Sequence, residues 1–338
     1  MSASASRGGF ALPSVLALVA VLSLVLLSAA AALSAGQATA REALERADFQ
    51  RAAMSAEARA LFLVATSPFA PDGLRVGAGP EAPMLTTGPS PLRLDGRAYV
   101  WPAEGRPDLA VSLQDEAGLV NVDASRPDAI LRLLARLRLS ATEAETLRDR
   151  LLDALDSDDR VRPRGLEASG YRAQGRTPPP VGGFADLAEL AFIPGWEPLA
   201  AGDRRRELAG LATAVRGSRA FNVNTAPAAV LEIVLGVSPQ TASRIVQARE
   251  ERPIQTLAQL GLPGVEPGAP AVRPGGSVRL IVADRRAGLT YASRLAPGGG
   301  PAGPPWTAGA MILGREPAAS DPSHGPVLAD PTAAAPQR

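Results

Sequence analysis

The sequence lacks most of the side chains on which enzymes and metalloproteins depend. Its 338 residues include no cysteine, and all 35 of its cationic side chains are arginines because lysine is absent. The first absence excludes disulfides, thiol catalysis and thiolate zinc sites, and the second excludes a Schiff-base lysine and the lysine-bearing phosphate loop. The single histidine, His324, lies in a tail rich in proline, alanine and serine. Serine–histidine–aspartate hydrolysis and histidine metal sites are therefore nearly excluded as well.

Neither sign of charge dominates the chain. The arginines are balanced by 34 acidic residues, and the net charge of +1 gives no electrostatic argument for a nucleic-acid partner. Carboxylates are the main catalytic groups that remain, and the candidate pairs are Asp115 with Glu116 and the group from Asp153 to Asp159. Solvated helix-end charge is the commoner explanation of such groups, and no pattern supplies a nucleophile, a base and an orienting group together. The sequence therefore predicts a protein that is not an enzyme.

The amino-terminal segment is long and apolar enough to cross a membrane. No charged residue occurs between Arg7 and Arg41, and the strongly apolar part covers residues 10–33. A helix of this length spans about 36 Å, which exceeds the roughly 30 Å of bilayer hydrocarbon. The run is also longer than the ~7–15 residues of an ordinary secretory signal. A signal peptide removed near Ala35 and a plain single-pass anchor are two interpretations of this segment.

A third interpretation comes from residues 7–13, RGGFALP, which resemble a type IV prepilin-like leader. The resemblance implies that a prepilin peptidase cuts between Gly9 and Phe10 and methylates the new Phe10 amine. The apolar helix, with Leu12, then stays as membrane anchor and assembly surface. Most such proteins carry glutamate at the fifth mature position, where it pairs with a neighbouring subunit's terminal amine. This chain has Ser14 there, which suits the end of a filament better than its middle.

The helix is expected to continue past the membrane. Residues 41–64 are rich in helix-forming alanine, arginine, glutamate and leucine, with no glycine or proline. Apolar residues at steps of mostly three or four predict the face of this helix that packs on the protein. That expected face consists of Leu44, Ala47, Met54, Ala58, Leu61 and Val64. The residues expected to face water are Glu42, Glu45, Arg46 and Glu57.

The middle of the chain contains a diverged internal repeat. Ser140 and Glu143 have the spacing of a capping box, which predicts a helix from there to about Leu155. Ser238, followed by proline, predicts a corresponding helix through Glu250. A polar opening and a shorter helix precede each of them, at residues 121–139 and 222–235. The two copies lie about one hundred residues apart, and we interpret them as two small helix-loop-helix units.

The polar openings are expected to cap the first helix of each unit. Asparagine and aspartate accept hydrogen bonds from the first backbone N–H groups of a helix, which have no partner within it. The residues expected to cap in this way are Asn121, Asp123, Asn222 and Asn224.

An acidic cluster lies where the helix that follows Ser140 ends. It consists of Asp153, Asp156, Asp158, Asp159 and Glu167. Carboxylates at this position oppose the negative end of the helix dipole, so something should neutralise them. One candidate is the group Arg160, Arg162 and Arg164, and the other is a hard cation with oxygen ligands, such as Ca²⁺. The spacing does not match an EF-hand.

Strands are expected on both sides of the helical region. Period-two patterns and flanking turn residues predict them at residues 97–101, 109–113, 277–283, 288–294 and 308–313. From about Glu316 the chain is expected to be disordered.

Four motifs in a fixed order carry a specific resemblance. They are the leader, DEAGLVNVD, LLDALDSDDRVRPRGLEASGY and FNVNTAPAAVLEIVLGVSPQTASRIVQARE. Over residues 7–291 the chain resembles the K-type minor pseudopilins of the type II secretion system. The resemblance implies an α+β, type IV pilin-like fold, with a long N-terminal helix packed on a small antiparallel sheet. It also implies a large inserted α-helical domain made of two helix-hairpin-helix (SAM-like) units.

The same resemblance implies a function in assembly. Such a protein caps the pseudopilus tip together with the I- and J-type minor pseudopilins and helps to initiate assembly for export of folded periplasmic proteins. Other expected partners are the major pseudopilin, the prepilin peptidase and the inner-membrane secretion platform, with no nucleic acid. The expected location is the inner membrane, single-pass, with the C-terminal domain in the periplasm.

Calcium near the acidic cluster is also implied by the resemblance. The expected ligands are Asp156, Asp158, Asp159 and Glu167. Two features depart from the family pattern, namely Ala154, where an aromatic residue is common, and the long arginine- and proline-rich loop at residues 160–180.

The expected segments are a leader at 1–9, the assembly helix at 10–66 and the first part of the pilin domain at 67–118. Helical units follow at 119–218 and 219–275, then the C-terminal strands at 276–315 and a disordered tail at 316–338.

One alternative function is a membrane-anchored periplasmic DNA receptor of the competence type. Helix-hairpin-helix proteins bind phosphates through backbone N–H groups at a helix N-terminus. The hairpin at residues 235–239 contains Gly236, lacks a second glycine, and loses one donor at Pro239.

Overall fold

The computed structural model describes residues 11–76, 92–100, 109–180, 182–261, 274–284, 286–297, 306–308 and 314–315. The chain forms two compact units, Met1–Met54 and Ser55–Arg338. The leader with Gly9 and Phe10, most of the strand expected at 308–313 and the tail from Glu316 lie outside the described residues.

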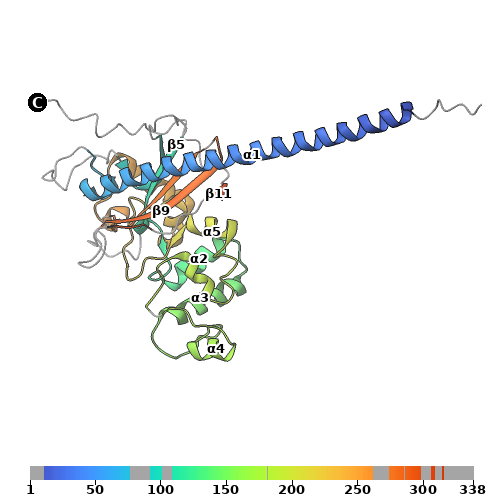
Figure 1. The fold of residues 1–338 in the computed structure, drawn as a ribbon. Coiled ribbons are helices and arrows are strands. Elements are labelled where there is room, and N and C mark those ends of the chain that lie inside the picture. Colours follow the sequence, from blue (N-terminus) through green and yellow to red (C-terminus); the bar gives the residue numbers. More distant parts are fainter. Residues whose placement is uncertain are drawn as a thin grey trace, which may run out of the picture. The chain divides into compact units, whose positions relative to one another are not determined.

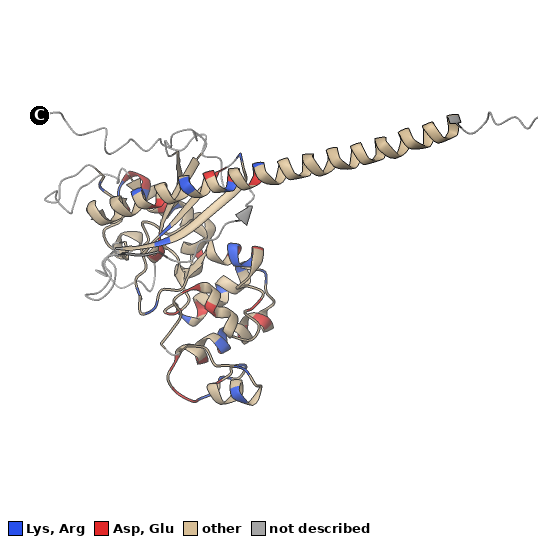
Figure 2. Cartoon of the chain, in the orientation of Figure 1, with Lys and Arg blue, Asp and Glu red and all other residues tan. Residues whose placement is uncertain are grey.

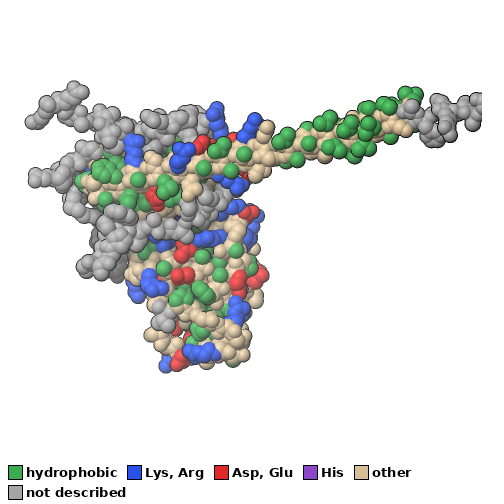
Figure 3. Space-filling model, in the orientation of Figure 1, with side chains coloured by type: hydrophobic (Ala, Val, Ile, Leu, Met, Phe, Trp, Pro, Cys, Tyr) green, Lys and Arg blue, Asp and Glu red, His purple; other side chains and the backbone are tan. Residues whose placement is uncertain are grey.

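Helix α1 (Ala11–Thr66) is a single unbroken helix, as predicted (Figure 1). Its first part is long and apolar enough to span a membrane, and none of the side chains in its most apolar window is buried. Figure 2 shows no charged residue along this part, and Figure 3 shows hydrophobic side chains following one another along it. An exposed apolar surface of this length requires a non-aqueous environment, so the segment fits a transmembrane anchor.

The second half of α1 buries a different face from the one predicted. The buried residues follow one another at steps of four and three and are Phe49, Ala53, Ala56, Ala60 and Leu63. Of the predicted face, Leu44 is 65% exposed and Met54 is 54% exposed, whereas Val64 is buried as expected. The predicted face included Ala47 and Ala58 but missed Phe49 and Leu63, because the spacing of apolar residues does not show what packs against a helix. Three alanines line the buried face, and their small side chains allow close packing.

Glu57 was predicted to face water, but its carboxylate contacts the sheet. Its carboxylate accepts a hydrogen bond from the Tyr291 hydroxyl at 2.5 Å and another from the Ser293 hydroxyl. Both partners lie on strand β9 (Leu289–Pro297), so Glu57 joins the end of α1 to the sheet.

The main sheet is antiparallel, with strand order β10-β9-β8-β5-β4, and β11 also pairs with β9. The strands besides β9 are β4 (Asp95–Val100), β5 (Leu109–Asp115), β8 (Val278–Asp284), β10 (Trp306–Ala308) and β11 (Gly314–Arg315). Strand β5 pairs with β8 along its whole length, and β8 shows the predicted alternation of buried and half-buried residues. The described parts of the strands predicted at 97–101, 109–113, 277–283 and 288–294 are confirmed. A smaller sheet contains β1 (Phe69–Ala70), β2 (Gly73–Leu74) and β3 (Leu92–Arg93).

The helical region is inserted between β5 and β8, which are neighbours in the sheet. Its helices are η1 (Glu116–Gly118), α2 (Pro127–Arg136), α3 (Ala141–Leu155), α4 (Ala168–Ala173), η2 (Leu187–Phe192), α5 (Gly202–Ala209), α6 (Ala228–Leu235), α7 (Pro239–Glu251) and η3 (Leu257–Leu260). Two short strands, β6 (Val120–Asn121) and β7 (Ala212–Thr213), pair in parallel within it. The predicted α+β class with a large helical insertion is therefore confirmed.

Two helix pairs, α2 with α3 and α6 with α7, form the predicted repeat, and α2 packs against α6. Ser140 Oγ accepts from the Glu143 backbone N–H at 3.3 Å, while a Glu143 carboxylate oxygen accepts from the Ser140 N–H at 3.0 Å. Ser238 Oγ accepts from the Thr241 N–H at 3.2 Å. Both predicted caps are therefore confirmed. One apolar core runs through both helix pairs and includes the fully buried Trp196, whose indole donates to the Leu147 carbonyl at 3.0 Å.

Candidate metal centre and the polar junction

The four residues predicted to cap the first helix of each unit do not cap it. Helix α2 begins after Arg126 and helix α6 begins after Pro227, and neither of these residues makes a side-chain cap. The capping prediction for Asn121, Asp123, Asn222 and Asn224 is therefore wrong. A tight turn separates these four residues from the first turn of the helix, so their side chains do not reach its free N–H groups.

The two asparagines that open the units build equivalent turns. Asn121 Oδ1 accepts from the Asp123 N–H at 3.3 Å, and Asn222 Oδ1 accepts from the Asn224 N–H at 3.0 Å. A side-chain bond to the backbone two residues further on is the pattern of an Asx turn. The repeat seen in the sequence is therefore real in the local backbone, although its asparagines serve a turn and not a helix end.

The residue two positions after each of these asparagines binds a backbone N–H group far away in the chain. Asp123 Oδ2 accepts from the Phe184 N–H at 2.8 Å, and Asn224 Oδ1 accepts from the Ile254 N–H at 2.7 Å. Buried backbone N–H groups need such partners, so these side chains fix the loops that close each unit.

Asp115, at the end of β5, is fully buried and joins the sheet to the second helical unit. Its Oδ2 accepts from Asn222 Nδ2 and from the Thr225 hydroxyl, both at 2.9 Å. Its Oδ1 accepts from the N–H groups of Ala117 and Gly275, at 3.1 and 3.0 Å. None of these four donors is a cation, and burial raises the pKa of Asp115.

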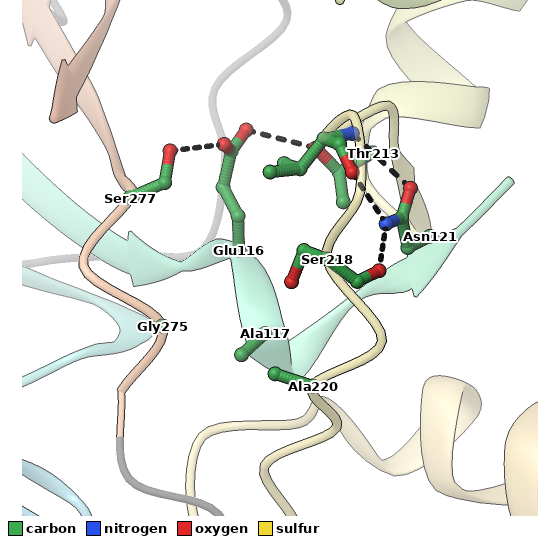
Figure 4. Close-up of a pocket in the computed structure, with 9 residues that line it drawn as sticks. Glu116, Ala117, Asn121, Thr213, Ser218, Ala220, Gly275 and Ser277 are labelled. Carbon is green, nitrogen blue, oxygen red and sulfur yellow. Dashed lines mark hydrogen bonds between the residues drawn. The ribbon is translucent and has the colours of Figure 1, made fainter. Parts of the chain in front are cut away.

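Glu116 is also buried, but two arginines neutralise it. Arg294 Nε lies 2.8 Å from one carboxylate oxygen and Arg279 Nη2 lies 3.1 Å from the other. The Ser277 and Thr213 hydroxyls donate to the same carboxylate at 2.6 and 3.0 Å (Figure 4). Burial alone would raise the pKa of Glu116, but the arginines outweigh it and hold the pKa below its usual value.

The cavity beside Glu116 is only about 10 Å³ in volume, which is room for about one water molecule. Figure 4 shows the Glu116 carboxylate between Ser277 and Thr213, and Asn121 pointing to Ser218. Asp115 and Glu116 are therefore not solvated helix-end charges. They are structural groups that join the sheet to the helical region, and the adjacent acids of the sequence gave no signal for this burial.

Arg249 is a buried arginine that binds the backbone of the turn that begins at Asn222. Its guanidinium is buried and donates from Nη1 to the carbonyls of Val223 and Ala226, both at 2.6 Å. Burial lowers the pKa of Arg249 to about 10. The arginine satisfies carbonyls that the turn leaves without backbone partners.

The acidic face of α3 is bound by arginines from the loop that follows it. Arg162 Nη1 lies 2.5 Å from Asp153 Oδ1 and 2.6 Å from Asp156 Oδ2. The Arg162 backbone N–H also donates to Asp153 Oδ2 at 3.2 Å. Further along the loop, Arg164 pairs with Glu145. The loop therefore runs back along α3, and arginines do neutralise part of the cluster.

Three carboxylates of the cluster lie together beyond these ion pairs. Asp156, Asp158 and Glu167 each offer an oxygen, and these oxygens lie within 4.8 Å of one another. Asp159 is not part of this group, although it was predicted with them. Among the described residues, no hydrogen bond reaches Asp156 Oδ1 or Glu167 Oε1, and both atoms are buried.

Glu167 is the least accessible member of this group, since only 6% of its surface is exposed. Burial raises its pKa, and the neighbouring Asp153, Asp156, Asp159 and Asp158 raise it further. A buried carboxylate surrounded by like charges needs a cation or a proton. Carboxylate oxygens are the ligands that calcium prefers, so the donor set fits that ion.

The hairpin between α6 and α7 has fewer free donors than a phosphate site needs. Gly236 ends α6 in the left-handed region, and the Arg132 side chain donates to the neighbouring Ile233 carbonyl at 2.6 Å. At the start of α7, Pro239 has no N–H group and Ser238 already occupies the N–H of Thr241.

Comparison with known families identifies the helical region. Two models described as "Type II secretion system (T2SS), protein K" match residues 109–203 and 221–275. Over these residues the chain matches the type II secretion protein K family, which supports a minor pseudopilin role in type II secretion.

One solved structure similar to this chain is the crystal structure of the GspK-GspI-GspJ complex from the type II secretion system of enterotoxigenic Escherichia coli. The identity is 18% and the TM-score 0.49, over 80% of this chain and 99% of the other. No curated protein gives a significant match.

Proposed function

We propose that this protein caps the tip of the pseudopilus and helps to initiate its assembly for export of folded periplasmic proteins. The observation that carries the proposal is Ser14 within the apolar part of α1. A hydroxyl has no charge to pair with the terminal amine of a neighbouring subunit, whereas the glutamate common at this position does. A subunit without that acid therefore fits the end of the filament, where no further subunit above it brings a terminal amine that must be paired.

The inserted helical region supports the same position. It enlarges the head of the protein between two paired strands, β5 and β8, without interrupting the sheet. A head of this size would obstruct the stacking of another subunit above it. The I- and J-type minor pseudopilins are the proposed partners at the tip, and the major pseudopilin lies below.

The proposed location is the inner membrane, with residues 55–338 in the periplasm. A prepilin peptidase would cut between Gly9 and Phe10, and the secretion platform would then take up the retained helix. Leu44, Met54 and Phe62 are exposed apolar residues on the later part of α1 and would contact neighbouring helices.

We also propose that calcium binds to Asp156, Asp158 and Glu167. The ion would supply positive charge to these carboxylates and order the loop through Tyr171, whose hydroxyl is buried without a hydrogen-bond partner. This role is structural, and the protein is proposed to have no catalytic activity. The alternative, a DNA receptor, is tested by a gel-shift assay of the full chain in detergent, in which we expect no binding.

The tip position can be tested with a unique label because the chain contains no cysteine. Glu207 is exposed on α5, and a Glu207→Cys variant can be labelled with maleimide-gold. We expect gold at one end of each pseudopilus in electron micrographs, and a Glu207→Ser variant should give no labelling. Gold distributed along the filaments would contradict the proposal.

A further inference from the structure

Arg162 occupies a position within the acidic cluster where a cation would otherwise bind. Its Nη1 atom bridges Asp153 Oδ1 and Asp156 Oδ2, at 2.5 and 2.6 Å. Asp153 is buried, and only a third of the Arg162 side chain is exposed, so water screens this pair less than a surface ion pair.

Asp156 is shared between the arginine and the proposed calcium site. One of its oxygens, Oδ2, accepts from Arg162, while the other, Oδ1, is buried and has no hydrogen-bond partner. Asp156 also lies with Asp158 and Glu167, since one oxygen of each carboxylate lies within 4.8 Å of the others, and Oε1 of Glu167 is likewise buried and unpartnered. A cation bound there would therefore be a close neighbour of the guanidinium, and the two positive charges would repel each other.

Arg162 also holds the backbone of the loop against α3. Its N–H donates to Asp153 Oδ2 at 3.2 Å, and its carbonyl accepts from the Gly165 N–H at 3.0 Å. Next to it, the Arg164 N–H donates to Asp149 Oδ2 at 3.3 Å. Gly165 has no room for a Cβ because Asp153 Oδ2 lies against it. Hydrogen bonds of the Arg162 and Arg164 backbone, together with the ion pairs of Arg162, thus hold the loop against α3.

We infer that Arg162 is a resident cation of the acidic loop, which keeps the loop closed without calcium and competes with calcium for Asp156. The inference rests on the proposed calcium site. Replacing Arg162 by a neutral residue would release Asp153 Oδ1 and Asp156 Oδ2, so that a bound cation would meet four carboxylates and no competing charge. Calcium would then bind more tightly, and closure of the loop would depend on it.

The test uses the full-length protein in detergent and calcium chloride as the probe. Isothermal titration calorimetry is expected to show that Arg162→Gln binds calcium about 10- to 100-fold more tightly than the wild type. Arg162→Lys keeps the charge and should stay close to the wild type. Arg172→Gln removes an exposed charge of the neighbouring helix α4 and should change the affinity by less than about threefold.

Hydrogen exchange gives a second measurement that needs no bound metal. With a chelator present, the amides of Arg164 and Gly165 should exchange slowly in the wild type and in Arg162→Lys, and quickly in Arg162→Gln. Adding calcium should restore slow exchange in Arg162→Gln.

Two results would overturn the role of Arg162. In the first, the wild type binds calcium and Arg162→Gln binds it no more tightly. In the second, the Arg164 and Gly165 amides of Arg162→Gln exchange in chelator as slowly as those of the wild type. If the wild type and every variant bind no calcium, the calcium site itself is wrong and the competition is wrong with it.

Discussion

Glu57 of α1 and Tyr291 of β9 form a 2.5 Å hydrogen bond that fixes the long helix to the sheet. The Ser293 hydroxyl donates to the other oxygen of the same carboxylate. The end of α1 is therefore held on the sheet by a polar contact as well as by its buried alanines. We expect Glu57→Ala to lower the free energy of unfolding by about 1–3 kcal/mol, because two hydroxyls then lose a charged acceptor.

This loss can be measured by thermal or denaturant unfolding of the full chain in detergent. Glu42→Ala is the matched control, since Glu42 lies on an exposed turn of the same helix and pairs with Arg46 at the surface. The control should change stability by less than about 0.5 kcal/mol. Equal effects of the two variants would contradict the role of Glu57.

The raised pKa values of two tyrosines predict a loss of stability at high pH. Burial raises the pKa of Tyr99 and Tyr291 to about 12, and for Tyr291 the hydrogen bond to Glu57 adds to this effect. In the unfolded chain a tyrosine ionises near pH ~10. The stabilising contribution is therefore complete below pH ~10 and is lost as the pH rises towards 12. Absorbance of tyrosinate should show these residues ionising late, together with unfolding, and normal titration of all tyrosines would contradict the prediction.

Asp115→Asn should destabilise the junction of the sheet and the second helical unit. The aspartate accepts four hydrogen bonds, and an asparagine would place an N–H₂ group against two of the donors. We expect a loss of about 2–4 kcal/mol, measured by thermal unfolding. Asp203→Asn is the control, because Asp203 is 88% exposed on α5, and it should have little effect.

Gly118→Ala tests how closely the two parts of this junction approach each other. A Cβ at Gly118 would lie 2.7 Å from the Thr225 carbonyl carbon and 2.8 Å from Gln114 Nε2. Backbone must shift to admit the methyl group, at a cost of about 1–3 kcal/mol. Gly210→Ala should be tolerated better, since its nearest neighbour would lie 3.4 Å away. If the two variants melt at the same temperature, the junction is less tightly packed than described.

Glu167→Gln should remove the proposed calcium site. Glu167 is its most buried ligand, so a neutral amide there removes a charge and one oxygen from a site of three carboxylates. Calorimetry should show at least a roughly tenfold loss of affinity for calcium. Glu207→Gln changes an exposed acid on α5 and should bind calcium like the wild type. Wild-type affinity in Glu167→Gln would exclude this residue as a ligand.

The mature amino terminus tests the leader. Mass spectrometry of protein isolated from membranes should identify a peptide that begins with N-methylated Phe10. Cleavage near Ala35 would instead mean that the apolar helix is removed as a signal peptide.

Features with a local cause could be predicted from the sequence. The caps at Ser140 and Ser238 depend on residues within one turn, and both helices begin where the spacing placed them. The turns at Asn121 and Asn222 were recognised as a repeat, but their hydrogen bonds were assigned to the wrong groups. An asparagine can serve its own turn or a helix end, and sequence spacing alone does not decide between them.

Features that depend on distant segments could not be predicted in this way. The buried face of α1 is set by what packs against it, and the spacing of apolar residues along one helix does not show this. The grouping of Asp156 and Asp158 with Glu167, without Asp159, depends on how the loop folds back along α3. The burial of Asp115 likewise depends on Asn222 and Gly275, which lie far away in the chain.

The pairing of β5 with β8 has a consequence for the order of folding. The two strands meet along their full length, yet the whole helical region separates them in the chain. Bringing such distant segments together costs chain entropy, and contacts of this kind form slowly. Helices α2, α3, α6 and α7, whose contacts are mostly local, should therefore assemble first and bring the two strand ends close. The nascent chain would then complete its sheet last, after the peptide beyond Val278 has emerged.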